Sequence, residues 1–279
     1  MSIVSETNMQ FSYPLWSKDS IQLPVIDQIG NHSEATKIAK QYNVPHIFIP
    51  QLETLISNGV LGTDARQAGW DNIGEHCILA GKMALTTSRL VGLSDEDTLF
   101  TTQQAYIHDA TLRREKEKKA NDSTSTNGIT QAHVSEDFYQ ECEMVHPGIL
   151  QATSMDWRDY YRWEAPMLIM RYVDSCVGPS RIADTIWGRD TMQHWSERTD
   201  NLHERKRDIS VDIGRKLYGG IPAFKYLATV TADIETILHA TATEANPSIF
   251  QGRYERPTQF YNLVHNMMYS KYEDDQIVS

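Results

Sequence analysis

The sequence predicts an all-α fold, on three observations. Apolar residues recur at the three- and four-residue spacing of a helix along most of the chain. Proline, glycine or a capping residue stands at the ends of these stretches. No segment of useful length alternates polar and apolar residues as a half-buried strand does, and the chain has neither an internal repeat nor a heptad array. We therefore expect a helical bundle.

The N-terminal segment shows no clear period up to about residue 33. Pro14 and Pro24 would break a helix there. We expect an extended arm that packs on the body of the protein or on a neighbouring subunit. Ser33 is suited to cap a helix with an acidic first turn, and this helix should end before Pro45.

The next long helix should span about residues 70–90. Ile73, His76 and Met83 share one of its faces, because their separations follow the period of an α-helix. A further helix should begin after Ser94, which is followed by three acidic residues that favour a helix start.

The segment 115–131 has a different character. A Glu-Lys-Glu-Lys-Lys run is followed by a stretch of Asn, Asp, Ser, Thr and Gly. Such a stretch cannot bury enough apolar surface to offset the entropy lost on ordering. We expect a mobile loop close to the functional site, in a position to act as a lid.

The rest of the chain is also expected to be helical, with breaks where Pro and Gly occur. The expected segments are 47–56, 135–154 with an interruption at Pro147-Gly148, a helix from Pro166 to Gly178, 184–216, 223–242 and 257–272.

The charge balance limits the class of ligand. The formal net charge is −11 and the pI is about 5.3, and an acidic surface repels a phosphate backbone, which argues against nucleic-acid binding. A small anionic substrate is still compatible, because a bound cation reverses the local sign of the field.

The compartment is inferred from cysteines and from missing signals. Cys77, Cys142 and Cys176 are few and far apart, which argues against a disulfide framework, and Cys77 and Cys176 are expected as buried thiols. The N-terminus has no apolar signal core and no run approaches the length of a membrane span. We expect a soluble cytoplasmic protein.

Four residues on three successive predicted helices could hold a metal ion. They are His76, the pair His108-Asp109, and Asp174. Asp174 is the strongest indication of such a site, because burying a charged carboxylate in an apolar stripe costs free energy unless a cation pairs with it. A single histidine on an apolar face is more often a core residue than a ligand, but the combination with two carboxylates is typical of a divalent-ion site.

The order of these four residues along the chain is similar to that of a known enzyme family. The order His, then His-Asp, then Asp on successive helices resembles the HD superfamily of metal-dependent phosphohydrolases. The segments 71–77 (Asp-Asn-Ile-Gly-Glu-His-Cys) and 107–111 (Ile-His-Asp-Ala-Thr) are similar to its nucleotidase-like branch. The resemblance covers about residues 60–185 and implies an HD-type metal-binding core there, with 1–59 as an N-terminal arm and short helices and 186–279 as a C-terminal helical extension.

The resemblance also implies an activity. It implies one divalent ion on His76, His108, Asp109 and Asp174, and hydrolysis of a nucleotide or a related small phosphate ester. The ligand types suit Mn, Co, Fe, Zn or Ni, and the ion would activate water and polarise a phosphoryl oxygen. Besides Asp109, the candidate proton-transfer groups are Glu75 and Glu115.

A departure from that branch concerns the general acid. The branch carries a glutamate three residues after its His-Asp pair, where this chain has Leu112. This difference keeps open a second hypothesis, a catalytically degenerate domain that binds a nucleotide or a protein partner without turnover.

The substrate phosphate could be held by basic residues near the ligands. The candidates are Arg66, Arg113, Arg114 and Lys116. Guanidinium groups bind phosphate through two parallel hydrogen bonds, and an ammonium adds a point charge. For each of them alone, a solvated helix surface is the simpler interpretation.

Two further histidines leave the number of metal ions open. His133 and His146 lie between the His-Asp pair and Asp174. If both pointed inward, a two-metal oxygenase or phosphodiesterase of the superfamily would be the better interpretation. Apolar residues outside the core region also make a homodimer plausible.

Overall fold

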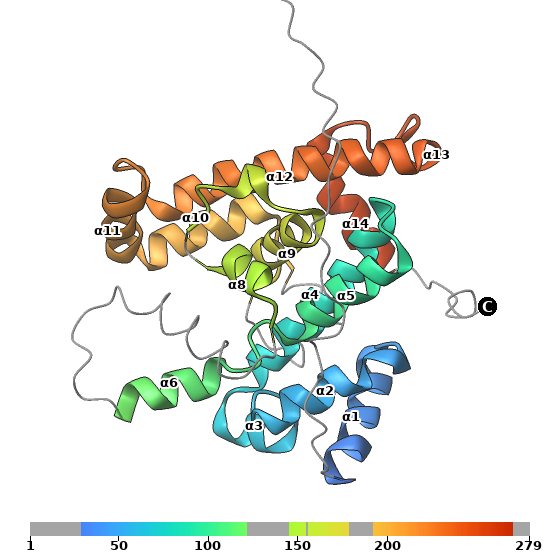
Figure 1. Cartoon of the computed structure of the whole chain (residues 1–279), viewed down its shortest axis with the longest axis vertical. Helices are drawn as coiled ribbons and strands as arrows, with labels where there is room; N and C mark the ends of the chain where they lie inside the picture. The colour runs from blue at the N-terminus through green and yellow to red at the C-terminus, as the bar shows by residue number, and fades with distance from the viewer. Residues whose placement is uncertain (1–28, 122–144, 155, 179–191, 270–279) are drawn as a thin grey trace, which may run out of the picture.

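A computed structural model describes residues 29–121, 145–154, 156–178 and 192–269 (Figure 1). These residues form helices and their connections, with no strand; their one β-type pairing is the isolated bridge between Val177 and Met192. The predicted all-α class is confirmed. Within this part of the chain no helix combines the length and the apolar character needed to cross a bilayer.

In chain order the α-helices are α1 (Ile29–Tyr42), α2 (Ile49–Ser57), α3 (Gly62–Ala68), α4 (Asp71–Leu90), α5 (Asp95–Ile107), α6 (Leu112–Asn121), α8 (Pro147–Thr153), α9 (Ala165–Cys176), α10 (Trp195–Arg205), α11 (Arg207–Leu217), α12 (Ala223–Ala245), α13 (Pro247–Phe250) and α14 (Phe260–Tyr269). Short 3-10 turns add η2 (His46–Phe48), η3 (Tyr160–Arg162) and η6 (Pro257–Gln259).

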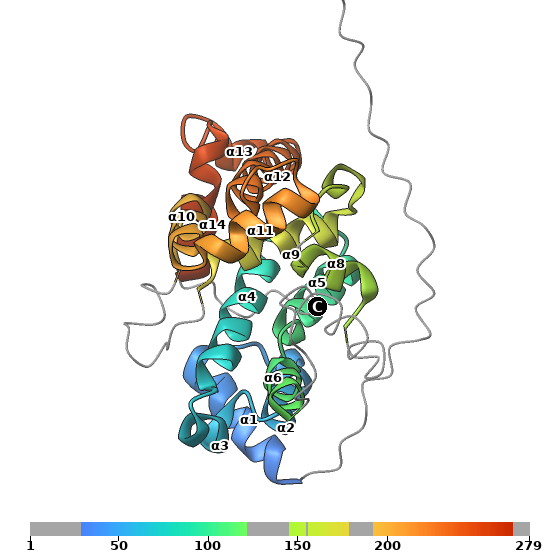
Figure 2. The ribbon, with the colours of Figure 1, turned by 90° about the vertical axis from the view of Figure 1, so that its left-hand side faces the viewer.

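Helices α4 and α5 form the centre of the fold. They pack on each other, and both also contact α9. Figures 1 and 2 place α1, α2 and α3 at one end of this central pair and α10 to α13 at the other. A single cluster of buried apolar side chains extends from α1 to α14. The three sequence segments expected as arm, core and extension therefore share one core, and their boundaries stay a sequence prediction.

The helix starts follow the expected chemistry. Ser94 caps α5 by accepting a hydrogen bond from the backbone N–H of Asp97, and the acidic first turn complements the helix dipole. Proline occupies the first turn of α9, where its missing N–H costs no hydrogen bond. The two predicted buried thiols, Cys77 and Cys176, are buried and free.

Two predicted boundaries were wrong. Helix α1 begins at Ile29, so the last residues of the expected arm are helical, and the earlier ones lie outside the described residues. Helix α6 continues to Asn121, although 115–131 was expected to be a loop; the remainder, from 122, also lies outside them. Lys and Glu are strong helix formers, and Arg113 and Glu117 form an ion pair of 2.8 Å one turn apart, which favours the helix.

Two other differences concern α8 and α3. Pro147 begins α8 instead of interrupting a helix, because its ring is tolerated at the first helical position. The short helix α3 was not expected. It ends at Gly69, whose φ of +78° is a left-handed conformation that glycine adopts at little cost.

The close approach of α4 and α5 depends on Gly81. A Cβ atom at this position would lie 2.5 Å from ring atoms of Tyr106, a distance that real side chains do not tolerate. The ring of Tyr106 is fully buried and also packs against Phe48 of η2. This contact fixes the end of α5, two residues before His108.

We expect Gly81→Ala to lower the free energy of unfolding by about 1–3 kcal/mol, the usual cost of overpacking a core. Urea unfolding followed by circular dichroism measures it. Thr86→Ala, a change on the same helix at a partly buried position, is the control and should stay within about 1 kcal/mol of the parent. Equal stability of Gly81→Ala and the parent would show that the close contact is not needed.

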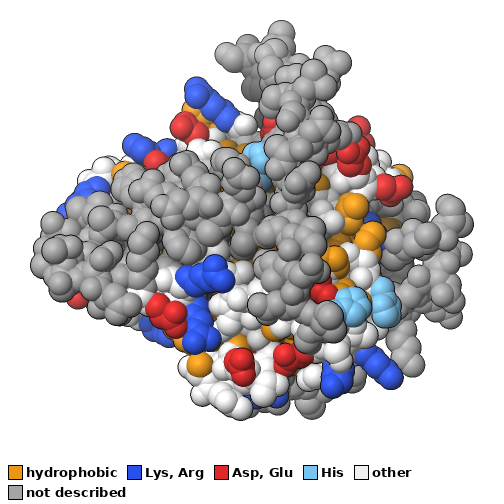
Figure 3. Space-filling model, turned by 60° about the horizontal axis from the view of Figure 1, so that its bottom comes forward, with side chains coloured by type: hydrophobic (Ala, Val, Ile, Leu, Met, Phe, Trp, Pro, Cys, Tyr) orange, Lys and Arg blue, Asp and Glu red, His pale blue; other side chains and the backbone are white. Residues whose placement is uncertain are grey.

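The described part of the surface in Figure 3 carries charged side chains of both signs. On the face in Figure 3, acidic and basic side chains are interspersed among the residues that are described. Whether the protein binds nucleic acid stays a sequence prediction.

Candidate metal centre

Three helices bring the candidate ligands together. His76 lies in the second turn of α4, His108 is the residue that caps the end of α5, and Asp174 lies near the end of α9. Since α4, α5 and α9 pack pairwise, the three side chains meet at a common point. His76 and His108 are buried, and the side chain of Asp174 is 16% exposed.

The distances between the ligand atoms are short. The Nε2 atoms of His76 and His108 are 3.1 Å apart. Oδ1 of Asp174 lies 3.4 Å from the first and 3.8 Å from the second. One ligand atom from each of the three residues lies within 4.8 Å of the other two, which makes them a possible metal-binding group.

Asp109 stands at the edge of this group. Its Oδ2 lies 3.8 Å from Nε2 of both histidines, and its side chain is 31% exposed. It is not part of the mutually close group of three. The fourth predicted ligand is therefore adjacent to the imidazoles and more open to solvent than the other three.

The spacing fits a coordinated ion. Two ligand atoms each about 2.1 Å from one ion are about 3.0 Å apart at a right angle and about 4.2 Å apart when opposite. The measured separations of 3.1–3.8 Å fall within these limits. The donor set of two imidazoles and carboxylates is one that suits divalent transition metals.

The hydrogen bonds of the rings support the same interpretation. Nδ1 of His108 lies 2.9 Å from the backbone carbonyl of Ala105. A carbonyl only accepts, so Nδ1 carries a proton and, in the neutral ring, Nε2 offers a lone pair toward His76. Such a backbone contact is how proteins orient a metal-binding histidine. For His76, Nδ1 is buried with no hydrogen-bond partner in the described residues.

Arg171 fixes the carboxylate of Asp174. Its Nη2 donates to Oδ2 of Asp174 at 2.5 Å, which leaves Oδ1 facing the histidines. Burial raises the pKa of Asp174, but the charge of Arg171, the two neighbouring histidine rings and the charge of Arg198 outweigh it and hold the pKa well below its usual range. Asp174 is thus an anion across the ordinary pH range.

His108 is more basic than an ordinary histidine when no ion is bound. Burial lowers its pKa, whereas the charge of Asp109 and contacts with Cys77 and Asp174 raise it, and the net result is well above the usual value. Because a metal ion takes the place of a proton on the imidazole, binding of the ion should weaken as the pH falls.

The other predicted catalytic residues have different surroundings. Glu75 is buried, accepts a hydrogen bond from the hydroxyl of Tyr42 at 2.8 Å and lies 3.9 Å from Arg66. Adjacent residues on a helix diverge by about 100°, which is why Glu75 faces α1 and α3 while His76 faces α5. Glu115 belongs to α6, but its side chain lies outside the described residues.

The predicted phosphate-binding residues hold the structure together. Arg66 pairs with Asp71 at 3.3 Å and remains 58% exposed. Arg113 donates to the backbone carbonyl of Gly59 at 3.0 Å, and Arg114 makes a long contact of 3.5 Å to that of Ser57. The ammonium of Lys116 lies 5.2 Å above the ring of Trp70. These contacts fix α6 against the end of α2; phosphate binding by these residues stays a prediction.

His146 has a structural contact. Its Nδ1 accepts a hydrogen bond from the N–H of Gly148 at 3.0 Å and so caps α8. Its ring packs edge-on to Phe100. Among the described residues, the group that could hold an ion with His76 consists of His108 and Asp174 and does not include His146. His133, the other candidate for a second metal, lies outside the described residues.

The cap at His146 predicts a pH dependence. Burial lowers the pKa of His146 to about 4, against about 6.5 for a free histidine. Between these values the unfolded chain binds a proton that the folded chain does not, so this contribution to stability is present above pH 6.5 and is lost as the pH falls toward 4.

His146→Asn keeps a side-chain acceptor for the cap but does not titrate. We expect its free energy of unfolding to change less between pH 6.5 and 4.5 than that of the parent, as measured by urea unfolding at both pH values. Identical pH profiles of the two proteins would contradict the assignment.

Two residues that sequence reasoning did not select are part of the site. Arg171 contacts Asp174 directly, and Nη1 of Arg198 donates to the backbone carbonyls of Asp174 and Val177. Arg171 could have been found, because it is a charged residue in an apolar stripe three positions before Asp174. Arg198 could not, since only the packing of α10 on α9 brings it there.

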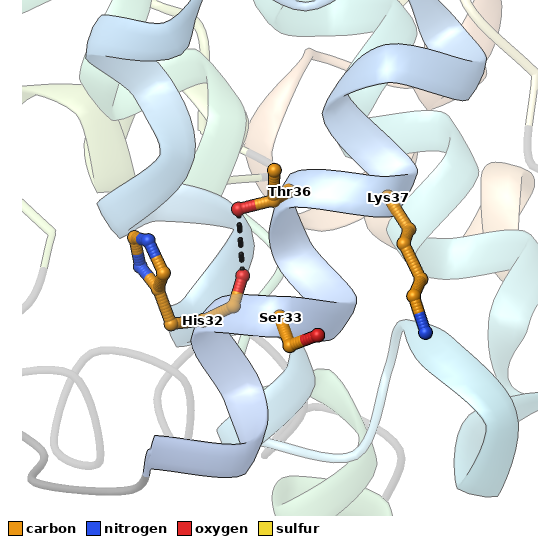
Figure 4. Close-up of a pocket in the computed structure, with 4 residues that line it drawn as sticks. All are labelled: His32, Ser33, Thr36 and Lys37. Atoms are coloured by element: carbon orange, nitrogen blue, oxygen red, sulfur yellow. Dashed lines mark hydrogen bonds between the residues drawn. The ribbon is translucent and has the colours of Figure 1, made fainter.

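The surface hollow on α1 is a separate feature. It is lined by His32, Ser33, Thr36 and Lys37 (Figure 4). The hydroxyl of Thr36 donates to the carbonyl of His32 at 2.8 Å, and the ring of His32 contacts Glu53 at 2.6 Å. None of the candidate metal ligands lines it, so we assign it no chemistry.

Comparisons with known proteins do not identify a relative. No protein-family model matches the chain, and neither a curated protein nor a solved structure is similar to it. The functional assignment therefore rests on the residues and on their geometry.

Proposed function

We propose that this protein is a metal-dependent phosphohydrolase of the HD type that acts on a nucleotide or a related small phosphate ester. The observation that supports it best is the meeting of His76, His108 and Asp174, with ligand atoms 3.1–3.8 Å apart, from three helices. The ion would be a single divalent transition metal, one of Mn, Co, Fe, Zn or Ni. When bound, it would supply an activated water molecule and polarise a phosphoryl oxygen.

The residues of the chain have distinct parts in this proposal. Arg171 orients Asp174 so that one oxygen faces the ion, and the carbonyl of Ala105 fixes the tautomer of His108. Asp109, the most exposed of the four, is suited to ligate the ion from the open side or to accept a proton there. Arg198 adds positive charge beside the carboxylates, where negative charge of a phosphoryl group would develop.

The test is a substrate screen. Purified protein is incubated with mononucleotides, dinucleotides and simple phosphoesters, with added Mn²⁺ or Co²⁺ or with a chelator, and released phosphate is measured. We expect release that needs the metal and that falls by at least about 10²-fold in Asp109→Asn, in line with losses of single electrostatic groups at active sites. Release that is insensitive to both the chelator and Asp109→Asn would reject the assignment.

A second candidate is a binding domain without turnover. Leu112 stands where the resembled branch has its acid and packs against the hydrophobic core, and Glu75 is already engaged by Tyr42 and Arg66. If the metal binds stoichiometrically but no phosphoester in the screen is hydrolysed, this candidate is favoured. The capping contact of His146 favours one-ion chemistry over the two-metal alternatives.

A further inference from the structure

Helix α11 presents a partly apolar face at the edge of the molecule. The helix packs on α10 and α12. Figure 1 places it at the left edge of the upper group of helices, and Figure 2, drawn from that side, shows it facing the viewer. Ser210 and Gly214 lie on its buried side. Ile209, in contrast, is 50% exposed, and Ile213 is only partly buried.

The connection that follows α11 adds a second exposed isoleucine. The backbone of Ile221 lies against the helix, since a Cβ atom at Gly214 would be 2.2 Å from the carbonyl oxygen of Ile221. The side chain of Ile221 is 51% exposed. Ile209 and Ile221 are thus two of the four large apolar side chains that are strongly exposed in the described part of the chain. Exposed apolar side chains that gather at one place are typical of an interaction surface.

Two charged residues flank the isoleucines of the helix. Asp212 and Lys216 form an ion pair of 2.7 Å, and their side chains are 57% and 41% exposed. Successive helical residues are about 100° apart, so a residue three positions further on lies about 60° short of a full turn. Asp212 is related in this way to Ile209, and Lys216 to Ile213. Both charges therefore lie on the same side of the isoleucines, with the acid nearer the start of the helix and the base nearer its end. We call Ile209, Ile213, Ile221, Asp212 and Lys216 the α11 surface.

This order of charges makes the α11 surface complementary to itself. In an antiparallel pair of helices related by a two-fold axis, the same flank of each helix meets. Asp212 then faces Lys216 of the partner subunit, and Lys216 faces the partner's Asp212, while the isoleucines are buried between the helices. A parallel pair would instead place like charges opposite each other, which is destabilising.

The local charge also permits two copies to approach here. The whole chain has a net charge of −11, and two acidic molecules repel each other. Helix α11 differs from the chain as a whole, because its bases outnumber its acids. The acids are Asp208 and Asp212, and the bases are Arg207, Arg215 and Lys216.

We propose that the α11 surface binds the same surface of a second copy of this chain, so that the protein forms a two-fold dimer through antiparallel α11 helices. Each copy contributes one helix of 11 residues and the connection after it. Interfaces this small belong to the weak and transient class, so the dimer should form and dissociate with protein concentration. The inference does not depend on the metal centre or on the proposed function.

The experiment is sedimentation velocity of the full chain at about 1–100 µM, a range that covers the dissociation constants of weak complexes. The parent should change from monomer to dimer across this range. Ile209→Asp places a charge in the middle of the contact and should raise the dissociation constant at least about tenfold. Ile47→Asp is the matched control, because Ile47 is a 57% exposed isoleucine of η2, and it should associate as the parent does. Circular dichroism checks the helix content of each protein.

Two charge variants test the orientation of the helices. Asp212→Lys leaves two bases on the flank of each copy, and Lys216→Asp leaves two acids, so each variant alone should associate at least about tenfold more weakly than the parent. Both variants lose the ion pair within α11. An equimolar mixture of the two should form a mixed dimer at least about tenfold more tightly than either variant alone, because opposite charges then face each other at both positions.

Three results would overturn the inference: a parent that stays monomeric over the whole range, an Ile209→Asp variant that associates as the parent does, or a mixture that associates no more tightly than its components. A further arm adds vesicles of phosphatidylcholine and phosphatidylserine to the parent and to Ile209→Asp. Vesicle binding that depends on Ile209, by a parent that does not self-associate, would assign the α11 surface to a lipid and reject the dimer.

Discussion

His108→Ala should abolish specific metal binding by the purified protein. The variant removes one of the two imidazoles whose Nε2 atoms are 3.1 Å apart, and Asp174 and His76 alone do not complete the site. A ligand that binds only the folded state stabilises it by about 2.7 kcal/mol at 100 times its dissociation constant. At the metal concentration that stabilises the parent by this amount, we expect the metal not to stabilise the variant.

The measurement combines elemental analysis of the protein as purified with thermal unfolding at several metal concentrations. His32→Ala is the matched control, because it removes an exposed histidine of α1 and leaves the centre intact. Asp109→Asn is a second, isosteric test at a more exposed position. If both His108→Ala and Asp109→Asn retain one metal per chain, the candidate metal centre is not where the ion binds.

Arg171→Met should cause the largest loss of stability in the metal-free protein. It leaves the carboxylate of Asp174, only 16% exposed, without its 2.5 Å partner. Removing one member of a buried pair typically costs about 3–5 kcal/mol, because the other charge stays buried and uncompensated. A divalent ion at His76 and His108 supplies positive charge to the same carboxylate, so added metal should restore part of the loss.

Urea unfolding with and without the metal measures both effects. Arg158→Met is the matched control: Arg158 pairs with Asp156 at 2.6 Å, but the two side chains are 53% and 45% exposed. Pairs in solvent contribute about 0–1 kcal/mol. A cost for Arg171→Met no larger than that for Arg158→Met would show that Arg171 does not compensate a buried charge.

Local patterns were sufficient for most of the fold. The helices that became α4, α5, α9 and α12 have apolar faces and clear end signals, and the structure has them close to the predicted bounds. The errors occurred where local signals were ambiguous. The Glu-Lys run of α6 lacks apolar residues and so resembles a loop, yet its helix propensity and the contacts of Arg113 with Gly59, just after α2, and with Glu117 make it helical.

The candidate site was predictable in composition and only partly in geometry. His76, His108, Asp109 and Asp174 were selected from residue type and position on helix faces, and the structure brings three of them into one group with Asp109 beside it. Glu75 was selected for its nearness in sequence to His76. Its side chain leaves α4 in another direction, toward Tyr42, because neighbouring helical residues point about 100° apart.

The sequence by itself determined that this protein is all-helical and which imidazoles and carboxylates could serve as ligands, since helix periodicity and residue chemistry are local properties. Only the tertiary structure decided that three of these groups meet and that Arg171 and Arg198 accompany Asp174. The meeting of these groups depends on how helices far apart in the chain pack. That packing is set by side-chain volumes; for example, α4 and α5 approach closely because Gly81 has no Cβ atom to collide with the ring of Tyr106.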